Sequence, residues 1–149
     1  FDHIMEKYGI EKIKTIGDAY MAAGGLPTAK EGHEVNVVKA GIEIQEFVTD
    51  LAEKRRKQGK PYFEMRVGIH TGPVVAGIVG VKKFQYDIWG DTVNIASRME
   101  THGETGRVNI SSSTYAMIKD DPQFSFESRG KIDAKGKGEI EMYFVHLNT

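Results

Sequence analysis

The feature that most constrains the fold is a long helical pattern that is apolar on two sides. Between Ala29 and Gln58, apolar residues recur three or four positions apart, the spacing of one helix face. This first stripe consists of Val37, Gly41, Ile44, Val48 and Leu51, and a second stripe on the opposite side consists of Val35, Val38 and Ile42. A helix with two apolar sides needs cover on both, so we predict that its first half is buried between two layers.

Short extended segments surround this helix and indicate an α+β fold. Strands are predicted on both sides of a tight turn at Gly17–Asp18 within residues 10–26, at 62–70 with an apolar return strand at 74–79, at 84–89, at 108–110, and as a final antiparallel pair at 124–132 and 139–147. Further helices are expected up to Gly9, from an N-cap at Asp91 to His102, and over 113–119. We predict one domain over residues 1–149, with a mainly antiparallel sheet and helices on one face of it.

Composition excludes several classes of protein. The 149 residues include no cysteine, which excludes a disulfide scaffold, a thiolate zinc site and a cysteine nucleophile. Lys and Arg number 20 against 21 Asp and Glu, whereas nucleic-acid-binding proteins usually carry a clear basic excess. No apolar run approaches the ~20 residues of a membrane span, so we expect no direct membrane insertion of this segment. The 17 glycines lie largely inside apolar runs rather than in linkers.

Three charged residues of the predicted strands each allow two interpretations. Asp18 follows Gly17 in the hairpin turn, where aspartate is common, but a carboxylate there also suits Mg²⁺. Lys14, on the same hairpin, is either a solvated strand lysine or part of a site. Arg66 is either a surface arginine or a guanidinium that binds a phosphate through paired hydrogen bonds.

The segment around the second long helix is the more informative one. Asn94 and Arg98 are four residues apart, so they share the polar side of the helix with Asp91. An amide beside a guanidinium suits a sugar and a phosphate, although a plain polar helix face has the same pattern. Asp87 precedes the helix among aromatic residues, where a carboxylate needs a partner. Lys135 lies in a Lys-Gly-Lys-Gly loop that either turns a hairpin or lets the backbone approach a polyphosphate.

Together these motifs resemble the class III nucleotide cyclases, the adenylyl and guanylyl cyclase catalytic domains. The matching stretches occur in family order and are KIKTIGDAYM at 12–21, MRVGIHTGPV at 65–74, QYDIWGDTVNIASR at 85–98, and the segment from Arg129-Gly130 to the KGKG at 135–138. The resemblance implies an α+β, ferredoxin-like cyclase fold that lacks its first strand and the helices after it. It also implies a cytoplasmic domain that forms a head-to-tail homodimer with composite sites, even where the parent protein is membrane-anchored.

The resemblance assigns metal, phosphate and purine roles to four residues. Asp18 matches the second metal-ligating aspartate, for Mg²⁺ or Mn²⁺ with two ions per intact site, and Arg66 matches the arginine that contacts the triphosphate. Lys14 and Asp87 match the purine-selecting pair. An ammonium beside a carboxylate fits the N1 acceptor and N6 donor of adenine, whereas guanylyl members tend to carry glutamate and cysteine there. ATP is therefore the expected substrate.

The remaining matches concern the reacting groups. Asn94 matches the ribose-positioning asparagine, Arg98 the arginine that stabilises the transition state, and Lys135 the lysine on the terminal phosphates. The implied reaction is attack of the ribose 3′-oxygen on the α-phosphorus, which gives 3′,5′-cyclic AMP and pyrophosphate. No side chain of this sequence stands out as a general base.

One departure and three alternatives accompany this interpretation. The first metal-ligating aspartate of the family lies upstream of Phe1, so we expect this fragment to be weakly active or inactive while its parent is an active cyclase. A guanylyl cyclase and a non-catalytic cyclase-homology module for dimerisation are the nearest alternatives. The third, an unrelated ferredoxin-like binding domain, would have no reason to carry these motifs in this order.

Overall fold

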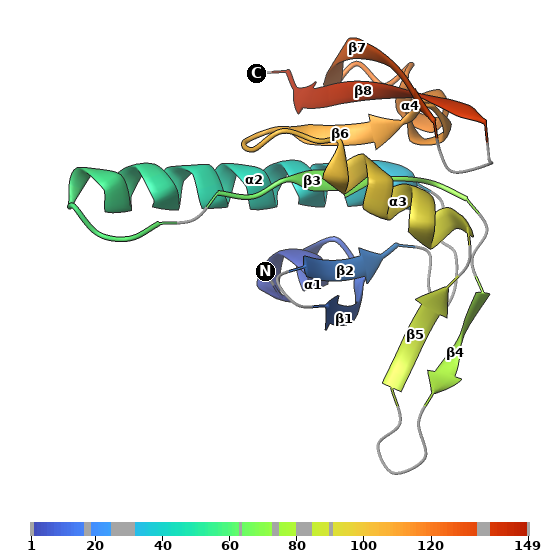
Figure 1. Cartoon of the computed structure of the whole chain (residues 1–149), viewed down its shortest axis with the longest axis horizontal. Helices are drawn as coiled ribbons and strands as arrows, with labels where there is room; N and C mark the ends of the chain where they lie inside the picture. The colour runs from blue at the N-terminus through green and yellow to red at the C-terminus, as the bar shows by residue number, and fades with distance from the viewer. Residues whose placement is uncertain are drawn as a thin grey trace.

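A computed structural model describes residues 2–16, 19–24, 32–62, 64–72, 75–79, 85–89, 91–133 and 138–148. Along this part of the chain the helices and strands follow in the order α1 (Asp2–Lys7), β1 (Glu11–Ile16), β2 (Ala19–Ala23), α2 (His33–Lys57), β3 (Val67–Ile69), β4 (Val75–Val79), β5 (Gln85–Trp89), α3 (Asp91–Thr101), β6 (Val108–Ser111), α4 (Ser112–Ile118), β7 (Phe124–Asp133) and β8 (Glu139–Leu147) (Figure 1).

The main sheet has four strands in the order β3-β6-β8-β7. Its β3–β6 pairing is parallel, whereas β6–β8 and β7–β8 are antiparallel. Two separate antiparallel hairpins, β1–β2 and β4–β5, lie beside it, and β4–β5 extends away from the sheet (Figure 1). The predicted α+β architecture with mainly antiparallel pairing is confirmed.

The prediction for residues 62–79 was wrong in two respects. Of the described residues in the expected 62–70 strand, only Val67–Ile69 form a ladder, and the strand at 75–79 pairs with β5 instead of returning along β3. Parallel strands need a long crossover connection, and the β4–β5 hairpin and α3 supply it between β3 and β6. Alternation of apolar residues indicates a strand but does not identify its neighbour, which explains the error.

Helices cover both faces of the main sheet, not one face as predicted. Val67 and Ile69 of β3 face α2, where their side chains approach Gly41. Gly68, the residue between them, faces the backbone of α3 at Met99 and Glu100. Because successive strand residues point to opposite faces, α2 and α3 lie on opposite sides of β3. The sheet is thus the middle layer at the point where α3 is attached.

The two-sided burial predicted for the long helix is confirmed in α2. Val38 and Ile42 belong to the core formed with β3, β6 and β8. Ala40, Ile44 and Val48 belong to a second core with α1 and the residue before β1. The helix begins at His33, after Gly32 with a φ of 79°, rather than at the expected residue 29. This arrangement fixes α2 between the main sheet and the N-terminal hairpin layer.

Candidate functional site

Helix α3 lies directly against β3 because two glycines leave room for it. A Cβ atom at Gly68 would overlap the backbone of Met99 and Glu100, and a Cβ atom at Gly72 would come within 2.7 Å of Thr92 Oγ1. Glycine inside a strand often marks a close backbone approach, and here it occurs near both ends of the helix. The strand and the segment after it therefore determine where the polar residues of α3 stand.

Asn94 and Arg98 lie on α3 as the sequence predicted. The helix spans Asp91–Thr101, so the two residues are one turn apart on the same side. Asn94 is exposed and Arg98 is half-buried, while Met99 is fully buried and anchors the helix. The side chains of Asn94 and Arg98 form no hydrogen bond or ion pair with another residue that the structure describes. Helix α3 thus carries an amide and a guanidinium on the same side.

Lys14 and Asp87 are brought to neighbouring strands. Lys14 lies in β1 opposite Met21, next to an irregularity in the register, and Asp87 lies in β5 opposite Gly77. Strand β1 contacts β5, and β5 contacts α3. The strands that carry these two residues, which are 73 positions apart in the numbered chain, therefore share one region with the helix that carries Asn94.

Arg66 lies at the far end of α3 from Asn94. Its Nη1 donates to the carbonyl oxygen of Thr101 at 3.2 Å, and its Nη2 lies 3.4 Å from Glu100 Oε2. The side chain is 43% exposed. A cation at this position is favourable because the last carbonyls of a helix are unpaired and carry partial negative charge. The guanidinium expected to bind phosphate thus holds the C-terminal end of α3 here.

Asp18 and Lys135 lie outside the described residues, as do the tips of both hairpins that carry them. Within the described part, no group of three or more histidine, aspartate or glutamate side chains is placed to hold a metal ion. A Mg²⁺ site needs few protein ligands, because one or two carboxylates with substrate phosphates and water complete its coordination. Asp18 is compatible with such a site on its chemistry.

Two residues that sequence reasoning assigned no role also hold the end of α3. Asn109 of β6 is fully buried, and its Nδ2 donates to the carbonyl oxygen of Met99 at 2.9 Å. Arg129 of β7 donates from Nη1 to the carbonyl oxygen of His102 at 2.7 Å. The sequence signals were a polar residue between two apolar ones in a short strand, and an arginine directly before Gly130. Neither signal shows, without the three-dimensional structure, which carbonyl group the side chain binds.

Polar side chains also connect the end of β3 to β6 and α4. A 2.6 Å hydrogen bond joins His70 Nδ1 to Ser111 Oγ, and a 2.8 Å bond joins the hydroxyl groups of Thr71 and Thr114. Ser111 and Thr114 are buried. Burial lowers the pKa of His70 below its ordinary value, so the ring favours its neutral form. These bonds fix the segment between Gly68 and Gly72 from the sheet side.

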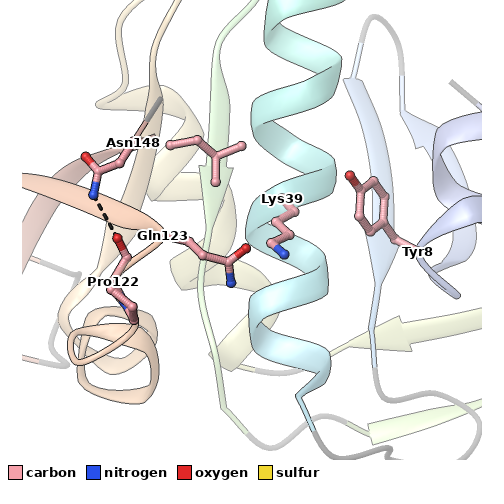
Figure 2. Close-up of a pocket in the computed structure, with 6 residues that line it drawn as sticks. Tyr8, Lys39, Pro122, Gln123 and Asn148 are labelled. Carbon is pink, nitrogen blue, oxygen red and sulfur yellow. Dashed lines mark hydrogen bonds between the residues drawn. The ribbon is translucent and has the colours of Figure 1, made fainter.

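Two hollows on the described surface are lined by none of the candidate residues. One, of about 490 Å³, is open between α1, α2 and the ends of β7 and β8. Figure 2 shows Lys39 between Tyr8 and Gln123 there, with Asn148 donating to the carbonyl oxygen of Pro122 at 2.9 Å. A second, of about 370 Å³, follows the C-terminal half of α2. None of the described helices is long and apolar enough to cross a membrane.

Comparison with known protein families gives one result over almost the whole chain. A family described as the adenylate and guanylate cyclase catalytic domain matches residues 1–147. Adenylate cyclases of Mycobacterium bovis and Mycobacterium tuberculosis are 39% identical over 145 residues, and guanylyl cyclase C of Homo sapiens is 42% identical over 147 residues. Each match covers 97% of this chain. The matched region is 31% of the length of the mycobacterial proteins and 14% of the length of the human one.

Solved structures give the same result for the fold. The adenylyl cyclase CyaB from P. aeruginosa superposes with a TM-score of 0.89 at 32% identity, covering 99% of this chain and 77% of that one. The guanylate cyclase domain of RhGC from Catenaria anguillulae, in complex with GTP, superposes with a TM-score of 0.85 at 34% identity, covering 99% of this chain and 78% of that one. Relatives of both substrate classes thus share this architecture.

Proposed function

Because the chain belongs to the adenylate and guanylate cyclase catalytic domain family, we propose that it forms 3′,5′-cyclic AMP and pyrophosphate from ATP. One observation carries the choice of substrate: Lys14 and Asp87 lie on strands that contact each other. That placement supports a shared purine pocket for an ammonium and a carboxylate. The placement of Lys14 and Asp87 is also compatible with a site whose other residues come from other elements of the fold.

The two side-chain types favour adenine over guanine on hydrogen-bonding grounds. Adenine presents an N1 acceptor and an N6 donor, which an ammonium and a carboxylate complement. Guanine presents an N1–H donor and an O6 acceptor at the same edge, so each protein group would then have to change partners. A site built to hydrogen-bond one pattern can reject the other by ~10⁴-fold or more when its groups are left unpaired.

The residues of α3 supply the proposed chemistry at the reacting centre. Asn94 would orient the ribose, so that its 3′-oxygen faces the α-phosphorus. As the bond between the 3′-oxygen and the α-phosphorus forms, the hydroxyl proton is released to solvent, the bond from the α-phosphorus to the bridging oxygen breaks, and pyrophosphate carries away the negative charge. Arg98 would stabilise the charge that develops on the phosphoryl oxygens, and Lys135 would bind the terminal phosphates. Catalysis of this kind depends mainly on positioning and electrostatics.

A divalent cation belongs to this proposal through Asp18. Mg²⁺ or Mn²⁺, bound by Asp18 and the nucleotide's phosphates, would neutralise phosphate charge and favour ionisation of the 3′-hydroxyl. Removing divalent cations with a chelator should abolish formation of cyclic nucleotide, and adding either cation back should restore it. Persisting turnover after chelation would contradict the metal requirement.

We further propose that two copies of the chain assemble head to tail in the cytoplasm and complete each other's sites. In this arrangement Asp18 and Arg66 of one copy face the α3 and purine residues of the other. One chain carrying both sets would give two equivalent sites in a symmetric dimer.

Subunit mixing tests this assembly in the natural full-length protein. Lys14→Ala and Asp18→Ala variants should each be inactive as homodimers. Their mixture should recover up to about a quarter of the parental activity, because half of the dimers are mixed and each holds one intact site. Lys54→Ala, an exposed residue at the end of α2, serves as the mutational control. If the variants fold and exchange subunits but mixing restores nothing, the composite site is wrong.

Guanylyl cyclase activity is the second candidate, because human guanylyl cyclase C is 42% identical over nearly the whole chain. Initial rates with ATP and GTP in parallel, each with Mg²⁺ and Mn²⁺, decide between the two. The double substitution Lys14→Glu with Asp87→Cys should shift preference from ATP toward GTP. A parent that already prefers GTP would refute the assignment to ATP. An inactive but dimeric parent would favour a non-catalytic module instead.

A further inference from the structure

We propose that Arg129 is a positioning residue that keeps α3 in place for the reaction. This inference rests on the proposed function, because it concerns the helix that carries Asn94 and Arg98. Among the described residues, the contacts of Arg129 are with His102 and Phe144 and not with a candidate site residue. It acts on them through the end of α3, and it connects this helix to β7, the strand that leads to Lys135.

The contact is a short hydrogen bond from a charged group to a helix end. Arg129 Nη1 donates to the carbonyl oxygen of His102 at 2.7 Å, directly after the last residue of α3. Helix C-terminal carbonyls lack partners within the helix, and a cation there also offsets their partial negative charge. Charge-assisted hydrogen bonds of this length are roughly twice as strong as neutral ones. The bond therefore restrains the helix along its axis.

Local structure keeps the Arg129 side chain in this orientation. The register of β7 against β8 shifts between Ser128 and Gly130, so Arg129 lies at a bulge. Its guanidinium carbon lies 4.1 Å from the centroid of the Phe144 ring, a ring that is 4% exposed. Bulges redirect side chains, and stacking on an aromatic ring restricts a guanidinium. The bulge and the Phe144 ring thus hold the long Arg129 side chain in one orientation.

Two other side chains also donate hydrogen bonds to carbonyl groups at the end of α3. Asn109 binds the Met99 carbonyl from inside the core, and Arg66 binds the Thr101 carbonyl from the exposed side. Arg66 is also the residue proposed to bind the triphosphate. If it turns to the nucleotide, its bond to α3 is lost while that of Arg129 remains. Arg129 is then the charged restraint on α3 during the reaction.

Arg107 provides a matched control for Arg129. Its guanidinium carbon lies 4.0 Å from the centroid of the same Phe144 ring, and its Nη2 pairs with Glu127 Oε2 at 2.8 Å. Its side chain forms no hydrogen bond with α3 among the residues described. Replacing either arginine with glutamine removes one guanidinium from Phe144. Only the Arg129 change also removes a donor from the end of α3.

The experiment measures kcat and KM for ATP in the natural full-length protein. We expect Arg129→Gln to lower kcat by ~10- to 100-fold with KM changed less than about threefold, since a misplacement near 1 Å can cost 10²-fold. Arg129→Lys should recover part of the loss, because an amine can still donate to the carbonyl. Arg107→Gln should retain kcat within about threefold. Equal losses for the two glutamine variants, or a change confined to KM, would overturn the inference.

A double-mutant cycle separates positioning from general destabilisation. If Arg129 acts through Arg98, adding Arg129→Gln to an Arg98→Ala protein should lower kcat much less than it does in the parent. If the two losses multiply instead, Arg129 does not act through Arg98 and the inference fails. An inactive parent with both nucleotides would refute the proposed function itself, which distinguishes that failure from this one.

Discussion

The contact between Gly68 and α3 gives a substitution whose effect can be worked out from geometry. In Gly68→Ala, the new Cβ atom would lie 2.6 Å from Glu100 Cα and nearer still to the Glu100 nitrogen and the Met99 carbonyl carbon. All three atoms belong to the helix backbone, so no side-chain rotation can relieve the overlap. Ordinary contacts between heavy atoms lie at about 3.5–4.0 Å, so α3 must move by more than about 1 Å.

The energetic cost follows from overpacking in a buried position. Extra methyl groups in well-packed cores cost typically ~1–3 kcal/mol, and a backbone clash places Gly68→Ala in the upper part of that range. For a domain of this size, ~2–3 kcal/mol corresponds to a fall in the melting temperature of about 5–10 °C. Because α3 carries Asn94 and Arg98, kcat should also fall, by ~10-fold or more.

Gly41→Ala is the matched control for this substitution. It adds a methyl group against the other face of the same strand, where the nearest atom is Ile69 Cδ1 at 3.1 Å. That atom ends a side chain and can move, and alanine in place of glycine favours a helix by ~1 kcal/mol. We expect thermal unfolding, followed by circular dichroism, to stay within about 3 °C of the parent. A Gly68→Ala protein as stable and active as Gly41→Ala would refute the reasoning.

Three further predictions concern the core and the groups that hold β3 and α3. Because burial lowers the native pKa of His70, the unfolded chain binds a proton at pH values where the native state does not. The free energy of unfolding should therefore fall as the pH drops from the ordinary pKa of 6.5 toward the native pKa. His70→Gln should reduce that fall, as measured by urea unfolding at each pH. Asn109→Asp places a carboxylate against the Met99 carbonyl in a fully buried position, so the free energy of unfolding at pH 7 should fall by about 3 kcal/mol or more, with part of the loss recovered in acid, where the protonated group can donate. Val38→Ala removes two methyl groups from a fully buried position of α2, and urea unfolding should register a loss of about 2 kcal/mol.

The substitutions at Asn109 and Val38 each have a counterpart at an exposed position of the same residue type or element. Asn36→Asp, in the first turns of α2, should change stability little. Phe47→Ala removes a larger side chain from α2, but that side chain is 54% exposed, so its effect should be much smaller than that of Val38→Ala. If the exposed variants cost as much as the buried ones, burial is not the cause.

The parts of the fold that follow from local pattern could be predicted from the sequence. The two-sided α2, the β7–β8 pair and the helix from Asp91 depend on periodicity and turn residues, and all three are present. The partner of β3 depends on which surfaces meet after the chain crosses over, and neither Val67 nor Ile69 encodes that choice by itself. The same limit applies to the faces of the sheet, because alternation assigns two faces without saying what covers each.

The same distinction between local pattern and tertiary contact applies to the candidate site. Motif order predicted Asn94 and Arg98 as site residues, and α3 carries both of them one turn apart. The supporting contacts of Asn109 and Arg129 join strands to carbonyl groups at the end of α3 that lie 10 and 27 positions away in sequence, and only the folded chain shows which carbonyl each one binds. The roles of all seven candidate residues remain predictions that the proposed assays address: Lys14, Asp18, Arg66, Asp87, Asn94, Arg98 and Lys135.

The position of α2 limits how a signal reaching the N-terminal helix could be transmitted. A helix exposed on one side can rotate about its axis at small cost, but α2 is buried against the main sheet and against α1 at the same time. Rotation would pull apolar groups out of both interfaces at once, whereas a shift along the axis would only exchange neighbouring contacts. A displacement of α1 would therefore reach β3, and through Gly68 the helix α3, as a translation rather than a twist.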